Sequence, residues 1–559
     1  MQLFDNLRGW SRFKVYRYMI LLGLSLAGDG WSYESSVIAS IIQMPAWIAN
    51  MGYTDGVIPD LEALILEALK FPNSPYSTPL ISASASVLAL PFPAHFPLAE
   101  PMDRPRLLLG QLVGGLIAAL FLDKLGRKPT MVVGAVLMEL STALLVWSGG
   151  YAVVICARVI EGVSIGFLLL GYQIYAVEIA AKEDRGFVSS FSLMTGNFFG
   201  LLAAGIIYGI SYDTGNVGWR AALGVTFIPA TLLLAVLPWV PESPRYLYEK
   251  GKEDECREVL GRLHGCTKDE GALVLSEDAE IEFEAMKAAI SWDQTHGQDK
   301  WAALWNSKAA RYRSFVACSS QSWWAWNGQS IFTYYYTIVF TAAGITDPHV
   351  QFGIAGVQNA SWCVGGIVGG YLLDYWGRRT NYLIGTGQAC VCLIIQGALA
   401  LGIFDKGIVQ WFLWVMFFSP VVNMLPAEIY SAGLRARGYA IANIFSMAVG
   451  FATQYSALPM YRSMNGWVWI FFSGCMLFAF SVIYFTYPET KGMTLEEVEV
   501  LFGTGAGQRV KAALGAPSGV QPHTPIHFRT GAARDIEEQE HDKADTAGKD
   551  VGGGVVGVA

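Results

Sequence analysis

Charged residues are scarce in this sequence of 559 residues, because Asp, Glu, Lys and Arg together make up 15%, against roughly 25% in soluble domains. A soluble chain of this length would divide into several domains, each with a polar surface, and so few charges cannot supply those surfaces. The scarcity of charge and the net charge of −8 also argue against a nucleic-acid-binding protein. The same composition excludes disorder over most of the chain.

Cysteine and histidine are infrequent as well, with 8 and 7 residues. Most of the cysteines lie in apolar runs, which is typical of small buried side chains and not of a disulfide framework. The histidines all lie outside the apolar runs, so a histidine proton relay is not expected. The sequence also contains no Walker loop, metal-binding cluster or nucleophile–base pair. We therefore expect no enzymatic activity, no metal site and no organic cofactor.

Apolar side chains dominate the composition of the chain. Hydrophobic residues make up 53% of the chain and aromatic residues 13%, and the mean hydropathy is +0.37. Runs long enough to cross a bilayer, about 20 residues each, occur along the chain, and nothing resembles a cleavable signal peptide. The sequence predicts an all-α, multi-pass membrane protein in a lipid bilayer with twelve transmembrane helices, at about 15–43, 107–122, 129–148, 151–174, 187–210, 220–240, 313–340, 351–373, 380–402, 408–430, 438–461 and 467–487.

Polar segments divide these runs into two groups of six. Basic residues concentrate at the N-terminus and in alternate loops, and the positive-inside rule makes those segments cytoplasmic. The tail is polar and Gly-rich; a short amphipathic helix is expected over Thr494–Phe502, and disorder beyond about residue 503. The predicted organisation is a cytoplasmic N-terminus at 1–14, a six-helix bundle at 15–240, a cytoplasmic middle loop at 241–312, a second six-helix bundle at 313–487 and a cytoplasmic tail at 488–559.

The segment 44–106 is unusual for a connection between two transmembrane helices. It is long, and Pro91–Arg106 holds five prolines and two arginines. Two interpretations stay open, a true extracellular cap and translated non-coding sequence. In either case the second expected helix keeps only about 16 apolar residues, which is short for a span.

The chain contains one internal repeat, with a spacing of about 250 residues. Three short motifs of the first six expected helices return in the same order in the second six. Two homologous six-helix halves are the organisation of transporters whose binding site lies at mid-membrane between the halves. The matched motifs are Asp123–Lys128 with Asp374–Arg379, Glu178 and Arg185 with Glu428 and Arg435, and Pro241–Ser243 with Pro488–Thr490.

With these motifs, the chain resembles the sugar porters of the major facilitator superfamily, including fungal-type hexose, disaccharide and quinate transporters. The resemblance rests on Asp-x-x-Gly-Arg-Arg/Lys in both halves, on Pro241-Glu-Ser-Pro-Arg245-Tyr-Leu, and on Pro488-Glu-Thr-Lys-Gly. It covers about residues 15–502 and excludes the 44–106 insertion and the tail. It implies the major facilitator fold, alternating access between two bundles, and a small-molecule substrate.

The repeated motifs place acids and arginines together at the inner ends of helices. We expect ion pairs here to form a cytoplasmic gate, which holds the two halves together while the protein is open to the outside. The alternative, that the charges only set topology, requires basic residues alone. The expected pairs are Asp123 with Arg127, Glu178 with Arg185, Glu242 with Arg245, Asp374 with Arg378, and Glu428 with Arg435.

Ionisable residues within spans are costly and are candidates for function. The segment Ser32–Val37 resembles the family's Gly-Tyr-Asp-x-Gly-Val element. This resemblance implies that Glu34 replaces the Asp of proton-coupled members and that Arg158 is its partner. We expect Glu34 to carry the coupling proton and Arg158 to control its release. A fixed buried ion pair is the alternative, and Glu161 competes for Arg158 from one helical turn away.

Sugar binding needs amides and hydroxyls for the sugar hydroxyl groups, and aromatic faces for the ring. The seventh expected helix is rich in both and resembles the family's Gln-Gln-x-x-Gly-x-Asn-x-x-x-Tyr-Tyr element, with Trp324 and Ala325 in place of the two Gln. This departure argues against a glucose-type site. The residues expected to contact substrate are Gln321, Trp326, Asn327, Gln329, Ser330, Tyr334, Tyr335, Asn197, Asn423 and Asn443. For Gln329 and Asn423, bonding between helices is the alternative.

These features predict a secondary transporter that takes up a sugar or polyol with a proton, working as a monomer in the plasma membrane. A carrier of a polyhydroxylated acid such as quinate would share every gate motif but would need a base in the site. Arg158 is the only strong internal base, which favours a neutral solute. The alternative from another class is a non-transporting nutrient sensor of the same fold. A sensor would signal through a long tail, whereas about 55 residues follow Gly503 here.

Overall fold

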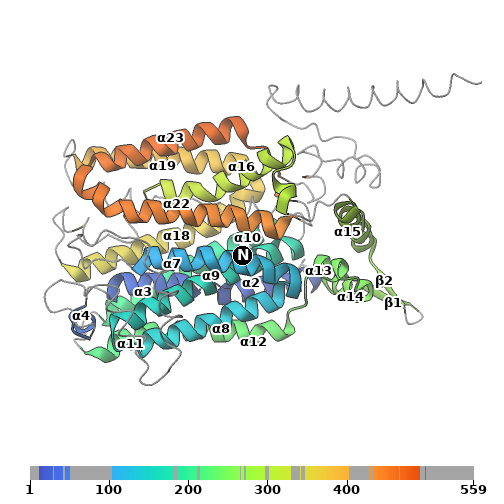
Figure 1. Ribbon diagram of the computed structural model, residues 1–559, viewed down its shortest axis with the longest axis horizontal. Helices are drawn as coiled ribbons and strands as arrows, with labels where there is room; N and C mark the ends of the chain where they lie inside the picture. Colours follow the sequence, from blue (N-terminus) through green and yellow to red (C-terminus); the bar gives the residue numbers. More distant parts are fainter. Residues whose placement is uncertain are drawn as a thin grey trace, which may run out of the picture.

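A computed structural model shows a bundle of long helices with a smaller layer of short elements at one end (Figure 1). It describes residues 12–28, 30–41, 44–50, 103–180, 185–210, 215–264, 266–269, 272–295, 301–328, 347–401, 434–464 and 466–491, with the single positions 331, 340, 429, 430 and 498. Most of the 44–106 insertion, most of the tenth expected helix, and most of the tail with its expected helix and disorder fall outside these residues.

The first part of the chain forms a set of long and short helices. The described residues of the expected span at 15–43 form two helices, one ending at Gly28 and the next beginning at Gly30. The helix of the second expected span is longer than its apolar run, since it begins at Asp103 and has 23 residues. The helices are α2 (Arg12–Gly28), α3 (Gly30–Ile41), α4 (Pro45–Asn50), α7 (Asp103–Leu125), α8 (Arg127–Val146), α9 (Tyr151–Ile179), α10 (Arg185–Ile210), α11 (Asn216–Gly224), α12 (Phe227–Val236) and the 3₁₀ helix η1 (Leu237–Trp239).

Glycines bring α7 and α9 into close contact. A Cβ atom on Gly110 would lie 2.4 Å from the carbonyl oxygen of Val159, and one on Gly114 would lie 2.5 Å from that of Val163. Gly166 of α9 approaches the α7 backbone as closely, because its Cβ position lies 2.5 Å from a backbone nitrogen. Small residues permit such close approach between membrane helices. This contact fixes α9, the helix that carries two of the buried charges described below.

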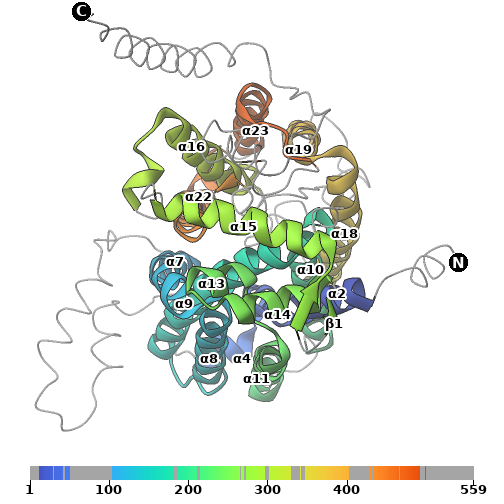
Figure 2. The same cartoon turned by 90° about the vertical axis from the view of Figure 1, so that its right-hand side faces the viewer.

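The middle of the chain folds into short elements and not into a simple loop. They are α13 (Pro244–Glu249), α14 (Glu253–His264), the antiparallel strands β1 (Cys266–Asp269) and β2 (Ala272–Leu275), α15 (Glu277–Thr295) and η2 (Trp301–Leu304). Cys256 of α14 and Phe283 of α15 are fully buried in one apolar cluster with Leu21 of α2 and Tyr175 of α9. These elements, α13 to η2, which we call the middle layer, therefore pack against one end of the first half. Figure 2 shows α13, α14 and α15 in front of the long helices.

The second part of the chain supplies α16 (Lys308–Ser322), η3 (Trp323–Trp326), α18 (Pro348–Trp376), α19 (Arg378–Ala400), α22 (Arg435–Met464) and α23 (Trp467–Thr486). The prediction of a continuous helix over 313–340 is wrong at the centre of that segment. Its α-helical part ends at Ser322, a 3₁₀ turn follows, and Gly328 has a φ of 72°, which residues with a side chain rarely adopt.

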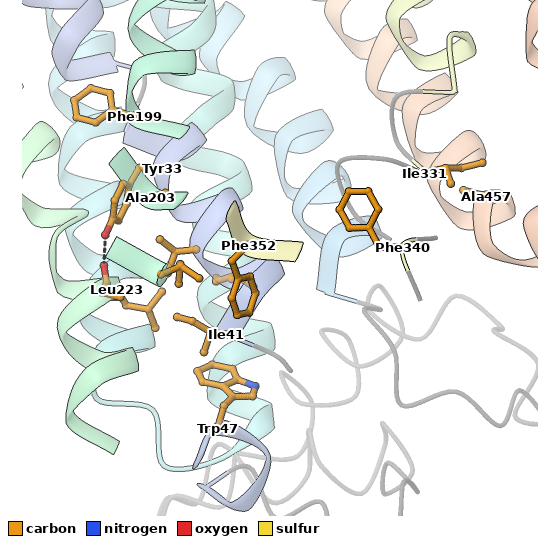
Figure 3. Close-up of a cluster of buried hydrophobic side chains, with 14 of the residues drawn as sticks. Tyr33, Ile41, Trp47, Phe199, Ala203, Leu223, Ile331, Phe340, Phe352 and Ala457 are labelled. Carbon is orange, nitrogen blue, oxygen red and sulfur yellow. Dashed lines mark hydrogen bonds between the residues drawn. The ribbon is translucent and has the colours of Figure 1, made fainter. Parts of the chain in front are cut away.

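Four stretches within the described residues are long and apolar enough to cross a membrane, namely Arg127–Val146, Val153–Ile179, Asn216–Trp239 and Trp467–Thr486. Helices of the two repeated halves also lie side by side, because α10 packs against α18 and α7 against α22. A large apolar cluster includes Tyr33, Ile41, Trp47 and Phe352 (Figure 3). The Tyr33 hydroxyl donates a 2.8 Å hydrogen bond to the carbonyl of Ala222, which ties α3 to α11.

Candidate functional site

Three charged side chains meet inside the bundle between α3 and α9. Glu34 comes from α3, Arg158 and Glu161 come from α9, and none of the three side chains has exposed surface. Nη1 of Arg158 lies 3.7 Å from Oε1 of Glu34 and makes a closer ion pair with Oε2 of Glu161. The structure thus brings together the two residues predicted for proton coupling and the acid predicted to compete for the arginine. We refer to these three residues as the buried triad.

The buried triad contains one more acid than base. With both carboxylates ionised its net charge is −1, and an uncompensated charge is costly where the side chains have no exposed surface. A proton on either acid makes the triad neutral. Neither carboxylate oxygen of Glu34 has a hydrogen-bond partner among the described residues, whereas Glu161 is bound by Arg158. Glu34 is therefore the acid better placed to take up and release a proton.

Five of the residues predicted to contact substrate lie in the described part of the chain. Gln321 lies at the end of α16, Trp326 and Asn327 at the end of η3, Asn197 on α10 and Asn443 on α22. Gln321, Asn327 and Asn443 are buried, while Trp326 is 38% exposed. Nδ2 of Asn197 donates a 3.1 Å hydrogen bond to a backbone carbonyl of α18, so this amide joins two helices. The other predicted contacts lie outside the described residues: Gln329, Ser330, Tyr334, Tyr335 and Asn423.

Three buried side-chain amides in the described region have no hydrogen-bond partner for their nitrogen. They are Nε2 of Gln321, Nδ2 of Asn381 and Nδ2 of Asn443. Asn443 faces α7, where its Nδ2 lies 3.5 Å from the Cβ position of Gly115. Leaving a buried donor unsatisfied costs about 1–3 kcal/mol, which an acceptor oxygen bound to such an amide would recover. Gln321 and Asn443 are the two of these three residues that the sequence analysis predicts to contact substrate.

Trp324 and Ser446 form a hydrogen-bonded relay that the sequence analysis did not predict. Nε1 of Trp324 donates to Oγ of Ser446 at 2.8 Å, and that hydroxyl donates to the carbonyl of Gln321 at 2.6 Å. The relay ties η3 to α22 and uses the indole N–H of Trp324. Trp324 and Ser446 are 122 positions apart, and no local pattern in the sequence indicates that they meet.

A second group of charges lies where α7, α8 and α9 approach the middle layer. Arg127 binds Glu178 through two hydrogen bonds, of 2.9 Å from Nε and 2.7 Å from Nη2, and both side chains are buried. Oγ of Ser243 donates to the same carboxylate at 2.5 Å. The expected pairing of Asp123 with Arg127 is wrong, because Arg127 begins α8 facing the end of α9 and is taken by Glu178. Bidentate pairs of this kind are among the strongest charge-assisted contacts.

Two arginines of α22 contact acids of the first half. Nε of Arg437 lies 3.0 Å from Oδ2 of Asp123, and Nη1 of Arg435 lies 3.6 Å from Oε1 of Glu178. Arg435, expected to pair with Glu428, therefore contacts an acid of the other half. Arg437 is not among the predicted gate residues. These contacts are ion pairs between the halves, as an inner gate requires.

Glu242 and Glu489 cap two helices in the same way. Glu242 accepts hydrogen bonds from the first two backbone N–H groups of α8 at 3.1 and 3.2 Å, and Glu489 from those of α19 at 2.8 and 3.1 Å. Gly126 and Gly377 precede these helices with φ of 108° and 91°, and a Cβ atom there would lie 2.5 and 2.6 Å from the capping carboxylate. Glu242, expected to pair with Arg245, thus satisfies unpaired N–H groups of a helix start.

Glu249, the last residue of α13, interacts with the charges of Arg127 and Glu178, and the sequence analysis did not predict it. Burial raises its pKa to about 6; the nearby arginines lower this pKa and the nearby acids raise it further. Glu249 ends a short helix of the middle layer, and no sequence motif there indicates that it lies near these charges. We name the whole group the inner cluster, which consists of Arg127, Arg435, Arg437, Asp123, Glu178 and Glu249.

The remaining predicted gate residues are only partly described. Arg245 and Arg378 are buried, with 5% and 3% exposure. Arg185 begins α10 and Asp374 lies near the end of α18, but their side chains fall outside the described residues, as does all of Glu428. Their expected pairs stay predictions.

Comparisons with known proteins agree with this architecture. The family model described as "Sugar (and other) transporter" matches residues 106–502. A low-affinity glucose transporter of Saccharomyces cerevisiae is 28% identical over 421 residues, which cover 71% of this chain and 72% of the relative. A probable polyol transporter of Arabidopsis thaliana is 28% identical over 438 residues, which cover 72% of this chain and 86% of the relative.

Solved structures of the same architecture are also similar. A proton:xylose symporter bound to 6-bromo-6-deoxy-D-glucose gives a TM-score of 0.68 at 20% identity, covering 88% of this chain and 99% of that chain. The inward-open conformation of the xylose transporter from E. coli gives 0.57 at 20% identity, covering 87% and 100%. These likenesses confirm the predicted major facilitator fold.

Proposed function

Because the chain belongs to the family of sugar and other transporters, we propose that it takes up a sugar or polyol by alternating access, in symport with a proton. The chain is a multi-pass integral membrane protein of the major facilitator fold, and its relatives are named transporters and not enzymes. The glucose and polyol transporters among them support the substrate class. The proton:xylose symporter of the same fold supports the coupling.

The observation that carries the proton coupling is the buried triad. Arg158 is held by Glu161 and lies 3.7 Å from Glu34, so a small movement of the guanidinium decides which acid it pairs with. While Arg158 stays with Glu161, a proton on Glu34 avoids an unpaired buried charge. When Arg158 moves onto Glu34, the pairing favours the carboxylate and releases the proton. A cycle of these two arrangements moves one proton for each substrate.

The inner cluster supports a closed cytoplasmic gate in this conformation. Arg127 and Glu178 belong to the first half, and Ser243 belongs to the middle layer that packs against it, so their hydrogen bonds can survive a rigid-body movement of that half together with the layer. The contacts of Arg437 with Asp123 and of Arg435 with Glu178 join the halves and must break when the protein opens inward. Several partly buried pairs are enough to bias two states that differ by a few kcal/mol.

The contacts of Arg158 favour a neutral solute over an acid such as quinate. An anionic substrate needs a cation at its carboxylate, and Arg158 is engaged by two acids. The amide donors of Gln321 and Asn443 suit hydroxyl or ether oxygens of a sugar or polyol. The side chain of Trp324, held by Ser446, presents an aromatic surface of the kind that packs against sugar C–H groups.

We further propose that both termini and the middle layer are cytoplasmic and that the membrane is the plasma membrane. Under this assignment residues 1–14, 241–312 and 488–559 lie inside, and 15–240 and 313–487 form the two six-helix bundles. The support is the distribution of basic residues. A thiol introduced near residue 275 should stay unlabelled by impermeant reagents in intact cells.

An uptake panel tests the proposed function. Labelled hexoses, pentoses, polyols and quinate are supplied to transporter-null cells that express the chain, with and without a protonophore. We expect accumulation of a neutral sugar or polyol, and loss of accumulation with the protonophore. Accumulation of quinate alone would contradict the substrate class, and uptake insensitive to the protonophore would contradict symport.

A further inference from the structure

Trp323, the first residue of η3, is bound by a tyrosine that is distant in the sequence. Nε1 of Trp323 donates a 2.9 Å hydrogen bond to the hydroxyl oxygen of Tyr487. Tyr487 directly follows α23, and 164 positions separate the two residues. Its side chain is buried and packs edge-on against the ring of Tyr382 on α19. The hydrogen bond therefore joins η3 to the C-terminal end of α23.

The hydroxyl group of Tyr487 is one link of an ordered chain of hydrogen bonds. Oγ of Ser319 on α16 donates to the carbonyl of Val316 at 3.1 Å, which uses the only proton of that hydroxyl. The hydroxyl oxygens of Ser319 and Tyr487 lie 2.8 Å apart, so the tyrosine is the donor between them. Tyr487 accepts from Trp323 at the same time. One hydroxyl group thus serves both α16 and η3.

Other contacts fix the same stretch of chain to two helices. The neighbouring Trp324 is held by Ser446 of α22. After η3, the Cβ position of Gly328 lies 3.1 Å from the ring of Phe472 on α23. We call residues 321–327 the substrate segment, because they include three of the residues predicted to contact substrate: Gln321, Trp326 and Asn327.

The position of the substrate segment depends on these outside contacts. Its α-helix ends at Ser322, and the hydrogen bonds of the 3₁₀ turn that follows have poorer geometry than those of an α-helix. We propose that Tyr487 is a positioning residue for substrate binding, whose hydroxyl group holds Trp323 and so sets where the substrate segment lies. This role rests on the proposed function, because the segment matters for affinity only if it contacts a substrate.

Tyr487 also connects the substrate segment to a repeated motif. Glu489, two positions later, accepts hydrogen bonds from the backbone N–H groups of Arg378 and Arg379 at 2.8 and 3.1 Å. One short stretch of backbone therefore carries both the anchor of the substrate segment and the cap of α19. A movement of this stretch moves both contacts, so substrate affinity follows the position of the start of α19.

Thiol labelling tests whether Tyr487 holds the segment, and it needs no substrate. Ser322→Cys is introduced into the full-length chain, since Ser322 is 4% exposed and directly precedes η3. A maleimide is added to the purified protein in detergent, and mass spectrometry of the peptide gives the labelling rate at this site. Tyr487→Phe should raise that rate at least fivefold, because it removes the hydroxyl group that accepts from Trp323 while the ring is kept.

Tyr312→Phe is the matched control for this variant. The hydroxyl group of Tyr312 also ties α16 to the end of α23, by donating to the carbonyl of Thr486, and that bond involves no residue of η3. A tie that only stabilises the two helices predicts equal effects of the two Tyr→Phe changes. The proposal predicts the parent labelling rate in Tyr312→Phe.

A double variant isolates the bond itself. Trp323→Phe removes the N–H group that Tyr487 accepts and should also raise the labelling rate. Tyr487→Phe combined with Trp323→Phe should label no faster than Trp323→Phe alone, because both changes remove the same hydrogen bond.

Uptake kinetics test the link to substrate. The probes are labelled D-glucose, D-xylose and D-sorbitol. For a probe that the wild type takes up, Tyr487→Phe should raise KM at least fivefold and change Vmax less than twofold, whereas Tyr312→Phe should keep both values.

Four results would overturn the proposal: parent labelling in Tyr487→Phe, equal effects of the two Tyr→Phe changes, additive effects in the double variant, or an unchanged KM despite faster labelling. Uptake of none of the three probes by the wild type would instead contradict the proposed function. The labelling rates would then still decide whether Tyr487 holds the segment.

Discussion

Arg437 of α22 lies 3.0 Å from Asp123 of α7, and this ion pair joins two halves of the chain that are built from the same motifs. The pair is partly exposed, at 20% and 27% of the two side chains. Arg435 of the same helix lies 3.6 Å from Glu178. In the described ion pairs between the halves, the first half thus supplies the acids and the second half supplies the arginines.

Removal of one arginine of this gate should favour the inward-open state. We expect Arg437→Ala to lower turnover more than substrate affinity. Partly exposed pairs contribute about 0–1 kcal/mol, which is up to about a fivefold change in the ratio of closed to open states. The measurement is labelling of a cysteine at the inner end of α9 together with uptake kinetics.

Two further variants control this experiment. Arg262→Ala removes an exposed pair with Glu258 in the middle layer and should leave labelling unchanged. The exchange of charges in Asp123→Arg with Arg437→Asp should restore part of the wild-type labelling. Wild-type labelling in Arg437→Ala would mean that this pair does not hold the gate.

The two capping glutamates should have equal effects on stability. Glu242→Ala and Glu489→Ala each remove the acceptor for two N–H groups at a helix start. Loss of such a cap costs about 0.5–2 kcal/mol, so thermal unfolding in detergent should begin several degrees lower in both variants. Glu255→Ala, an exposed acid of α14, is the control and should unfold as the wild type. A drop in one capping variant alone would show that the repeated motifs do not have the same role.

Glu249 should make inward opening sensitive to cytoplasmic pH. Burial raises its pKa to about 6 in the closed conformation, and water that enters on opening should return the pKa towards the ordinary value of about 4.3. The closed state then holds the proton more tightly, so acidification towards pH 6 and below stabilises the closed state. This stabilisation is lost as the pH rises above about 6.

The measurement is the rate of inward opening in vesicles, with the cytoplasmic side buffered between pH 5 and 7.5. The wild type should open more slowly at the acidic end. Glu249→Gln should be insensitive over this range, while Glu255→Gln, on the exposed side of α14, should behave as the wild type. A Glu249→Gln protein with the full pH dependence would assign the effect to another group.

The sequence predicted the symmetric features of the molecule well. The family, the fold and the glycine and glutamate of each repeated motif follow from spacing and residue type, and the structure adds the capping role of Glu242 and Glu489. The ion pairs were less predictable. Arg127 and Asp123 are four positions apart, which suggests a local pair, yet their partners are Glu178 and Arg437. Those partners are set by how whole helices pack, which local spacing does not encode.

The same limit applies to the substrate residues. The aromatic and amide content of the seventh expected helix predicts a substrate site there, which stays a prediction. The change from α-helix to 3₁₀ helix after Ser322 did not appear in the sequence pattern. The relay from Trp324 through Ser446 depends on contact between η3 and α22. Such contacts are decided by tertiary packing and not by the periodicity of one segment.

The last prediction concerns Glu34. Glu34→Gln keeps the size of the side chain and removes its titration, so it imitates the protonated state. If Glu34 carries the coupling proton, this variant should lose accumulation against a gradient, and its uptake should no longer depend on pH. Counterflow exchange should survive at least in part, because exchange needs no net movement of protons. The measurements are concentrative uptake between pH 5 and 7.5 and counterflow in preloaded vesicles.

Glu161→Gln is the matched variant, because it changes the other acid of the buried triad. Removing the close partner of Arg158 should free the guanidinium to pair with Glu34 at 3.7 Å or less. That pairing favours the Glu34 carboxylate, so proton uptake from outside should require a more acidic medium, and the pH profile should shift to lower pH without vanishing. Loss of coupling in Glu161→Gln but not in Glu34→Gln would reverse the roles of the two acids. Concentrative, pH-dependent uptake in both variants would reduce the buried triad to a structural link between α3 and α9.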